Sequence, residues 1–258
     1  MQKVLFHSTI FGPIKSRRLG VSLGVNLTPN DGKICSFDCL YCEAGLNAQG
    51  TGTTGFPSVE KVSRELKEKL KAMKENGEQL DVITFSGNGE PTLHPRFPEI
   101  INKVKEIRDK FYPEAKISVL TNSTRIDRSE IVEALRSIDN PILKLDSAID
   151  STIKLIDRPN SPDFTAKKVI EWLEGFGPSA IVQTMLLTGE HNGKIIDNTT
   201  DEEVEALIKA IEKIKPREVM LYSIDRPTPI TTLKSVPREK IEVVAEKLRH
   251  KGIKVSTV

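Results

Sequence analysis

Two hydrophobic patterns alternate along this chain of 258 residues. Short runs rich in valine, isoleucine and leucine are typical of buried strands. They occupy residues 22–27, 81–86, 116–122, 142–146, 180–187 and 218–224. Between them, apolar residues recur at three- and four-residue steps, which predicts amphipathic helices. These helical segments are 58–70, 95–110, 127–137, 163–176, 201–214 and 237–250.

The alternation of strands and helices predicts the fold class. Strands that alternate with helices form a parallel sheet with the helices outside. Six such units are too few for a closed eight-fold barrel. We therefore expect an α/β fold, a partial (β/α)6 barrel of TIM type, in a single domain spanning residues 1–258. Its parts would be an arm with the first strand (1–30), a loop that we call the cysteine loop (31–50) and an edge strand (251–258).

Glycine, proline and polar residues follow the predicted strands, as at 87–91, 121–124 and 188–193. In barrel enzymes the catalytic groups lie at the carboxyl ends of the strands. We therefore expect these three segments to be loops at the rim of the barrel, around a functional site.

Composition narrows the classes of function. Hydrophobic content of 38% and charged content of 29% are ordinary for a globular protein in water. A net charge of +2 is too small to indicate a polyanionic partner. We interpret the locally basic first 34 residues as a solvated arm, and the alternative is a contact with nucleic acid. Apolar runs long enough for a membrane helix or a signal peptide are not found in the sequence. We expect a cytoplasmic protein without membrane association.

The most specific chemistry lies in three cysteines, all within Cys35-Ser-Phe-Asp-Cys39-Leu-Tyr-Cys42. Thiolates are soft ligands suited to iron–sulfur clusters, zinc or copper(I). Three of them on one loop can hold three irons of a [4Fe-4S] cluster, and the chain has no cysteine for the fourth iron. That iron would be open to a small molecule. The spacing disfavours zinc, which prefers CxxC pairs, and the next histidine, His94, lies more than fifty residues later.

Two motifs resemble those of the radical SAM superfamily. One is the spacing CxxxCxxC with Tyr41 before the last cysteine, and the other is Phe85-Ser-Gly-Asn-Gly-Glu-Pro-Thr-Leu-His-Pro95, a GEPT variant of the GGE-type motif. The resemblance implies that S-adenosylmethionine (SAM) binds the open iron. An electron passed through the cluster would then split the sulfonium C–S bond, and the 5′-deoxyadenosyl radical would abstract a hydrogen atom. The resemblance also implies the partial barrel, whose protein groups orient the cofactors.

The resemblance assigns the turn after the second predicted strand to SAM. In the family this turn meets the methionine amino group, so we assign Gly87, Gly89 and Glu90 to that contact. Glycine at such a position lets a ligand approach the backbone closely. Asn88 replaces the first glycine of the usual pair. The alternative is a turn shaped by glycine and proline alone.

The fourth predicted strand carries a lysine and an aspartate on one face. Side chains alternate across a strand, so Lys144 and Asp146 would face the barrel interior together. A buried lysine needs an anionic partner. The segment resembles the S-L-D-S pattern of related enzymes, and we assign Lys144 to the SAM carboxylate. The alternative is a structural pair of Lys144 with Asp146.

Polar residues on neighbouring strands complete the predicted cofactor site. Asn122 and Ser123 lie where the family contacts the ribose or methionine part of SAM. Gln183 is the lone amide of the fifth predicted strand. It either points into the site or is an interior amide satisfied by its neighbours.

Four arginines are expected near the rim, and arginine suits the recognition of phosphate or carboxylate. Arg17, Arg18, Arg158 and Arg226 are therefore candidates for binding an anionic substrate. The alternative is that each is solvated or paired with a neighbouring acidic residue.

Within the superfamily the chain resembles the wyosine-synthase-like branch, whose characterised members modify a guanosine in tRNA. The likeness rests on the Arg17-Arg-Leu-Gly stretch, the GEPTLHP turn and the Arg226-Pro turn. A flavodoxin-like domain, a tRNA-binding extension and the cysteines of a second cluster are not evident. We therefore expect a flavodoxin or ferredoxin-type electron donor, and a tRNA nucleotide or small anionic, nucleotide-like metabolite as substrate. Two alternatives stay open: a glycyl-radical-enzyme activase, and a non-catalytic iron–sulfur or zinc-binding module.

Overall fold

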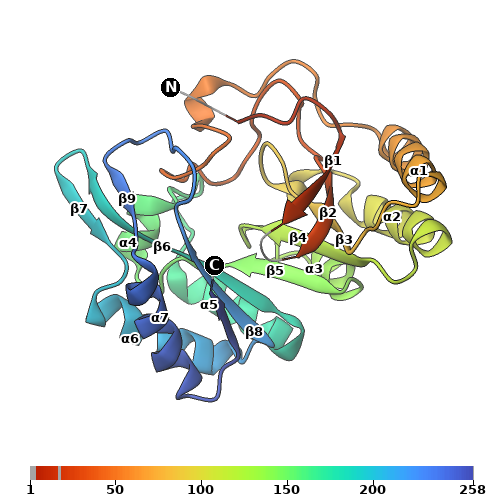
Figure 1. Cartoon of the computed structure of the whole chain (residues 1–258). Coiled ribbons are helices and arrows are strands. Elements are labelled where there is room, and N and C mark those ends of the chain that lie inside the picture. The colour runs from red at the N-terminus through yellow and green to blue at the C-terminus, as the bar shows by residue number, and fades with distance from the viewer. Residues whose placement is uncertain (1–3, 17–18, 258) are drawn as a thin grey trace.

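Figure 1 shows the computed structural model of the chain, which describes residues 4–16 and 19–257. Its centre is a sheet whose parallel strands pair largely in chain order. They are β2 (Gly20–Val25), β3 (Val82–Phe85), β4 (Lys116–Thr121), β5 (Asn140–Lys144), β6 (Ile181–His191), β8 (Glu218–Ser223) and β10 (Val255–Thr257). The hydrogen-bonded path ends at β10, so the described residues form an open, partial barrel, as predicted. β10 lies at this edge, in the segment where an edge strand is expected.

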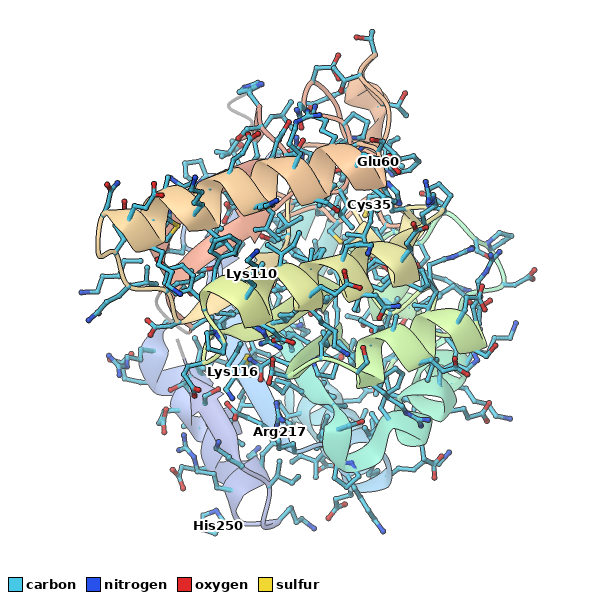
Figure 2. The ribbon with its side chains drawn as sticks, turned by 90° about the vertical axis from the view of Figure 1, so that its right-hand side faces the viewer. Cys35, Glu60, Lys110, Lys116, Arg217 and His250 are labelled. Carbon is cyan, nitrogen blue, oxygen red and sulfur yellow. The ribbon has the colours of Figure 1, made fainter. Side chains whose placement is uncertain are left out.

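Helices cover the outside of the sheet, as Figure 2 shows for α1, α2 and α3. They are α1 (Val59–Glu75), α2 (Phe97–Phe111), α3 (Ser129–Arg136), α4 (Asp150–Ile156), α5 (Ala166–Phe176), α6 (Asp201–Ile214) and α7 (Arg238–Arg249). Side-chain caps begin α1 and α6, where the hydroxyls of Ser58 and Thr200 accept from Lys61 N–H and Glu203 N–H. None of the helices in the described ranges is long and apolar enough to span a membrane.

Apolar side chains fill the layer between the sheet and the helices. Leu66 and Leu70 of α1, Ile83 of β3 and Ile101 of α2 are fully buried there. The spacing of four residues places both leucines on the same face of α1. Burying one such side chain stabilises the folded state by about 1.5–3 kcal/mol. This layer therefore holds the helices against the outer face of the sheet.

The inner face of the sheet changes from apolar to polar along the strands. Ile142, Ile181 and Met220 form a small apolar cluster inside the barrel. Two residues further along β5 and β6, Lys144 pairs in register with Gln183. Residues two apart lie on the same face of a strand. The carboxyl ends of the strands are thus lined by polar groups above an apolar floor.

Antiparallel strands and an extra helix depart from the predicted alternation. β1 (Ile10–Ser16) pairs with β2, while β7 (Lys194–Asp197) and β9 (Leu233–Ser235) pair with the far end of β6. The loop predicted at 188–193 is wrong, because β6 continues to His191 and turns at Asn192 and Gly193, whose φ angles are 50° and 74°. Asn-Gly strongly favours such two-residue hairpin turns, so the signal was present in the sequence. Helix α4 was also not predicted.

Candidate active site

Backbone contacts on two sides hold the cysteine loop over the carboxyl ends of the strands. On one side Ile34 forms a parallel bridge with Gly89, and the N–H of Glu90 donates to the carbonyl of Ile34 at 3.0 Å. On the other side Phe37 forms an antiparallel bridge with Pro159. Segments that lie far apart in the sequence therefore meet around the cysteines.

The three cysteines are free thiols on this loop. Cys39 is buried, while Cys35 and Cys42 are half-buried, and the N–H of Cys42 donates to the carbonyl of Cys39 at 3.1 Å. Burial, and then the charge of Asp157, raises the pKa of Cys39 well above its usual value. Burial, and then Glu90, raises the pKa of Cys35 to about 12. The raised pKa values favour the protonated thiols of Cys35 and Cys39, so binding of a metal must displace these protons.

Lys33 belongs to the site, which corrects its interpretation as part of a solvated arm. Its side chain is buried, and the ammonium group donates to the carbonyl of Gly45 at 2.7 Å. The nearer oxygen of Asp38 lies 3.7 Å from Lys33 Nζ. Burial lowers the pKa of Lys33, but the three cysteine thiolates and Asp38 raise it by more. The available signal was its position two residues before the first cysteine.

These groups fit an iron–sulfur cluster. Asp38 is ion-paired with both Lys33 and Arg158, so one carboxylate serves two cations. A cluster ligated by three thiolates carries net negative charge that would offset the remaining positive charge. Within the described ranges, no three His, Cys, Asp or Glu side chains converge on a position for one metal ion. A cluster takes one cysteine at each of three irons and does not need that convergence.

The glycines of the turn after β3 let the chain pack closely against itself. A Cβ atom on Gly89 would lie 1.9 Å from the carbonyl oxygen of Ile34 in the cysteine loop. A Cβ atom on Gly87 would lie 2.2 Å from Asn26 Oδ1, beyond the end of β2. Glycine is therefore needed at both positions for the fold, whereas their contact with SAM stays a prediction.

Glu90 positions this turn relative to β4. Its Oε1 accepts from the N–H and the hydroxyl of Thr92, at 3.1 and 2.6 Å, and from the hydroxyl of Thr121 at 2.7 Å. Its Oε2 accepts from the N–H of Asn122 at 2.7 Å. Burial raises the pKa of Glu90 by more than these donors lower it. Both oxygens of the Glu90 carboxylate already accept hydrogen bonds from the chain. We therefore expect this turn to contact SAM through its backbone and not through the Glu90 side chain.

Asn122 and Ser123 tie the end of β4 to its neighbours. The carboxamide of Asn122 donates to Ser36 Oγ at 2.9 Å and lies 3.5 Å from Cys35 Sγ. The hydroxyl of Ser123 donates to the carbonyl of Lys144 at 3.1 Å. Ser123 has a φ of 67°, an unusual backbone conformation for a residue with a side chain. Asn122 thus contacts the cysteine loop directly.

Lys144 lies at the centre of a network of polar side chains. Its Nζ is 3.1 Å from Asp146 Oδ2, 2.7 Å from the Tyr41 hydroxyl and 3.3 Å from the Tyr222 hydroxyl. The hydroxyl of Tyr41 also donates to Asp146 and lies 3.1 Å from Asp157 Oδ1. The structure therefore contains the Lys144–Asp146 pair. The contact of Lys144 with the SAM carboxylate stays a prediction.

The pKa shifts of Lys144 and Asp157 follow from their burial and from each other's charge. Burial, and then the charge of Asp146, raises the pKa of Asp157 well above its usual value, which favours the protonated carboxyl. Burial lowers the pKa of Lys144, but Asp146 and its other neighbours raise it well above its usual value. Lys144 is thus the cation that pairs with Asp146 in this network. The sequence analysis missed Asp157, which it read only as part of a rim Arg-Pro motif.

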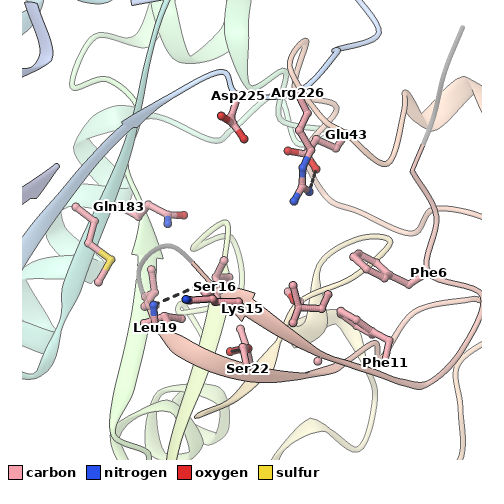
Figure 3. Close-up of a pocket in the computed structure, with 17 residues that line it drawn as sticks. Phe6, Phe11, Lys15, Ser16, Leu19, Ser22, Glu43, Gln183, Asp225 and Arg226 are labelled. Carbon is pink, nitrogen blue, oxygen red and sulfur yellow. Dashed lines mark hydrogen bonds and ion pairs between the residues drawn. The ribbon is translucent and has the colours of Figure 1, made fainter. Parts of the chain in front are cut away.

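A cavity of about 450 Å³ lies inside the barrel, as Figure 3 shows. Gln183 and Lys15 line it, and Arg226 and Glu43 close it on the opposite side. Gln183 therefore faces the cavity, the first of its two predicted placements. Glu43 directly follows Cys42, so the cysteine loop forms part of the cavity wall.

Of the four candidate arginines, Arg226 faces this cavity, with its Nη1 2.7 Å from Glu43 Oε2. Arg158 lines a separate outer cleft, and its Nη2 lies 3.2 Å from Asp38 Oδ2. Arg17 and Arg18 lie outside the described residues. Both described arginines are thus paired with a neighbouring acid.

An aromatic wall closes one end of the cavity. Phe6 and Phe11 line the cavity and stack with their ring centroids 3.8 Å apart. The ring of Phe11 also lies so close to β2 that a Cβ atom on Gly24 would be 2.1 Å from it. Asn88 fixes the arm, because its carboxamide accepts from the N–H of Phe6 at 2.8 Å and donates to its carbonyl at 2.9 Å. The residue that departs from the family pattern therefore anchors this wall.

A match to a family model now decides where the chain belongs. Residues 30–201 match the model of the Radical SAM superfamily. The chain is a member of the radical SAM superfamily. The matched segment contains the cysteine loop, the turn after β3 and the strand that carries Lys144. Membership supports an enzyme that uses SAM and an iron–sulfur cluster.

Relatives of this radical SAM protein occur in distant organisms. UPF0026 protein MJ1312 of Methanocaldococcus jannaschii is 31% identical over 241 residues, which are 92% of this chain and 68% of that protein. A UPF0026 protein of Helicobacter pylori strain J99 is 29% identical, over 85% of this chain and 67% of its own length. A Brachyspira hyodysenteriae protein named GTPase Obg is 33% identical over 90% of this chain but only 32% of its own length. The chain thus spans a third to two thirds of these relatives.

Solved structures share the fold. A radical SAM methyltransferase from Sphaerobacter thermophilus has a TM-score of 0.66 at 16% identity, covering 92% of this chain and 65% of that one. Streptococcus suis SuiB bound to S-adenosylmethionine has a TM-score of 0.64 at 15% identity, covering 91% and 50%. TYW1 with a lysine–pyruvate adduct has a TM-score of 0.60 at 14% identity, covering 89% and 73%. At these identities the likeness shows the fold, in agreement with the predicted partial barrel.

Proposed function

We propose that this protein holds a [4Fe-4S] cluster through Cys35, Cys39 and Cys42 and cleaves SAM reductively. The observation that carries the proposal is the buried ammonium group of Lys33 on the loop that carries the three thiols, which borders the cavity at Glu43. A loop with a purely structural role does not require a buried lysine whose carboxylate partner, Asp38, is shared with a second cation, Arg158. An anionic cluster explains both the cation and the thiols.

When bound, the cofactors supply the chemistry: one electron splits the sulfonium C–S bond, and the resulting 5′-deoxyadenosyl radical abstracts a hydrogen atom from the substrate. The residues of the chain orient these groups. The backbone at Gly87 and Gly89 is proposed to receive the SAM amino group, and Lys144 its carboxylate. Tyr41 and Asp146 hold the ammonium group of Lys144 at the inner face of β5.

For the substrate we propose a tRNA nucleotide or a nucleotide-like metabolite. The cavity of about 450 Å³ is in the range of small-molecule sites. Phe6 and Phe11 offer aromatic surface at one end, which suits a nucleobase. Lys15 and Arg226 are the cations of the lining, and an anionic group of the substrate would compete with Glu43 for Arg226. The resemblance to the wyosine-synthase-like branch supports the same class.

Anaerobic reconstitution with iron and sulfide tests the proposal. We expect about four irons per chain, and 5′-deoxyadenosine from SAM in the presence of dithionite. Tight binding of zinc without SAM cleavage would support the non-catalytic module instead. Added total tRNA should stimulate deoxyadenosine formation; stimulation by a candidate glycyl-radical protein instead would identify an activase.

A further inference from the structure

A second cleft lies outside the barrel, between α4 and the β6–β7 hairpin. Its volume is about 420 Å³, and none of its lining residues lines the inner cavity. In Figure 1, α4 and β7 lie together on the side of the molecule away from α1 and α2. The cleft is therefore separate from the place proposed for SAM and substrate.

The lining of this outer cleft is basic. Lys154, Arg158, His191 and Lys194 all contribute to it, and it contains no carboxylate. Lys154 and Lys194 are exposed, and neither forms an ion pair with any described residue. A concave surface with one sign of charge concentrates the electrostatic potential and attracts partners of opposite charge.

The floor of the outer cleft leads directly to the cysteine loop. Arg158 lines the cleft, and the preceding residue, Asp157, places its Oδ1 3.5 Å from Cys39 Sγ. The N–H of Asp38 donates to the carbonyls of Asp157 and Arg158, at 3.0 and 3.2 Å. Arg158 keeps a φ of 49°, a strained backbone conformation for a residue with a side chain. One residue and one contact thus separate the surface from a cysteine sulfur.

We propose that the outer cleft is the docking surface for the protein that reduces the cluster, an acidic one-electron carrier. This inference rests on the proposed function. One electron leaves the carrier and enters the cluster, so the carrier is oxidised and the cluster reduced by one electron, without transfer of a proton or a bond. Redox encounters use small interfaces and are steered by complementary charge, so a shallow basic cleft is sufficient.

The position of the cleft favours a carrier over an RNA. An electron carrier needs to come near the cluster and does not need to enter the inner cavity. An RNA substrate must place its reacting nucleotide in that cavity, with which the outer cleft shares no lining residue. The position of the outer cleft therefore fits docking of an electron carrier better than binding of an RNA substrate.

A neighbouring cleft also borders the cysteine loop, at Ser36, but the charges of its lining differ from those of the outer cleft. There, Arg125 and Lys168 are accompanied by Asp127 and Asp163 in the lining. Mixed charge of this kind attracts an acidic partner less than the basic lining of the outer cleft.

The experiment reverses the charge of the cleft in the reconstituted full chain, with Lys154→Glu and Lys194→Glu combined. Deoxyadenosine formation is measured with dithionite and, separately, with an FMN-loaded bacterial flavodoxin reduced by NADPH and flavodoxin reductase. We expect the dithionite rate to be unchanged, and kcat/KM for flavodoxin to fall about tenfold, mainly through KM. The matched control is Lys67→Glu with Lys74→Glu on exposed positions of α1, which should keep both rates.

Binding of the same flavodoxin is measured in parallel by interferometry at rising salt. We expect binding to wild type that weakens with salt, and little binding to the cleft variant. This binding measurement does not require the protein to cleave SAM. If the wild type binds flavodoxin through the cleft but cleaves no SAM, the proposed function is contradicted and the docking proposal is not. Unchanged flavodoxin binding and kinetics in the cleft variant overturn the docking proposal. The docking proposal is also overturned if the cleft variant loses as much deoxyadenosine formation with dithionite as with flavodoxin. It is overturned as well if the variant loses stimulation by tRNA but keeps normal flavodoxin kinetics.

Discussion

The two faces of the sheet are built by different physical effects. On the outer face, fully buried side chains such as Leu66 and Ile101 pack between the strands and the helices. On the inner face, Lys144, Tyr41 and Asp146 are held by hydrogen bonds and a balance of charge. Apolar packing depends on volume, whereas the inner network depends on each partner being present. Substitutions on the outer face should therefore change stability, and those on the inner face should change chemistry as well.

The largest effect is expected at the cysteine loop, which belongs to the inner region. Cys39→Ala, like a change of Cys35 or Cys42, should abolish cluster binding and SAM cleavage, because three ligands leave no spare. Iron content and deoxyadenosine formation after reconstitution measure both losses. A Cys39→Ala protein that keeps its iron and its SAM turnover would contradict the assignment of the ligands.

Lys144→Ala should come next, because it leaves Asp146 buried without its cation. We expect a loss of about 3–5 kcal/mol in the free energy of unfolding, with weaker SAM binding and an intact cluster. Urea denaturation and calorimetric titration with SAM measure the two effects. Combining Lys144→Met with Asp146→Asn removes both charges, and should restore most of the stability without restoring SAM affinity. Normal SAM binding by the alanine variant would contradict the carboxylate contact.

The outer face provides the contrasting case. Leu66→Ala removes a fully buried side chain of α1 and should lower the free energy of unfolding by about 2–5 kcal/mol. At a temperature where the variant remains folded, iron content and SAM affinity should match wild type. Lys67→Ala, at the next and exposed position of α1, is the control for stability. A loss of SAM binding by folded Leu66→Ala protein would contradict the claim that substitutions on the outer face change stability alone.

Glu90→Gln tests a residue at the boundary of the two regions. The glutamine oxygen is expected to take the place of Oε1, which has three donors, so the amide replaces Oε2 and leaves the N–H of Asn122 without a partner. The expected cost is about 1–3 kcal/mol of stability. Thermal denaturation measures this cost, and iron content should be retained. An unchanged melting temperature would show that the carboxylate does not fix the turn.

The smallest effect concerns pH and His94. Its Nδ1 accepts from Arg96 N–H at 3.1 Å, so Nε2 carries the proton donated to the Pro57 carbonyl at 2.8 Å. Burial lowers the pKa of His94 below its usual value of 6.5. The folded protein therefore favours the neutral ring, and stability should decline as the pH falls below 6.5. His94→Asn, which keeps an acceptor for Arg96, should show a smaller decline in acid urea titrations; an identical decline would exclude His94 as its cause.

The regular elements and the cysteine motif were predictable because they depend on local pattern. Periodicity placed the parallel strands and the main helices, and the spacing of the cysteines indicated a cluster site. Alternation along one strand put Lys144 and Asp146 on the same face, and they form the pair that was the alternative to a contact of Lys144 with SAM. The hairpin at Asn192 was also signalled by its turn residues, but the glycine-rich rim was interpreted as a loop.

Other features depended on contacts between distant segments. Lys33 looked like one more basic residue of an arm, and only the folded loop places its ammonium group beside the cysteines. Asp157 follows a helix that was not predicted, and becomes part of the site by packing against Cys39 and Tyr41. The basic cleft likewise joins α4 to a hairpin some forty residues later in the chain.

By itself, the sequence determined which groups can carry the chemistry, since residue type and short spacing are properties of the chain alone. The tertiary structure decided which charges are buried, which are paired and which remain on the surface. Those properties follow from the approach of segments distant in the sequence, where loss of water makes each charge depend on its partner. In this protein, folding buries Lys33 in the cysteine loop and leaves Lys154 and Lys194 exposed in the outer cleft.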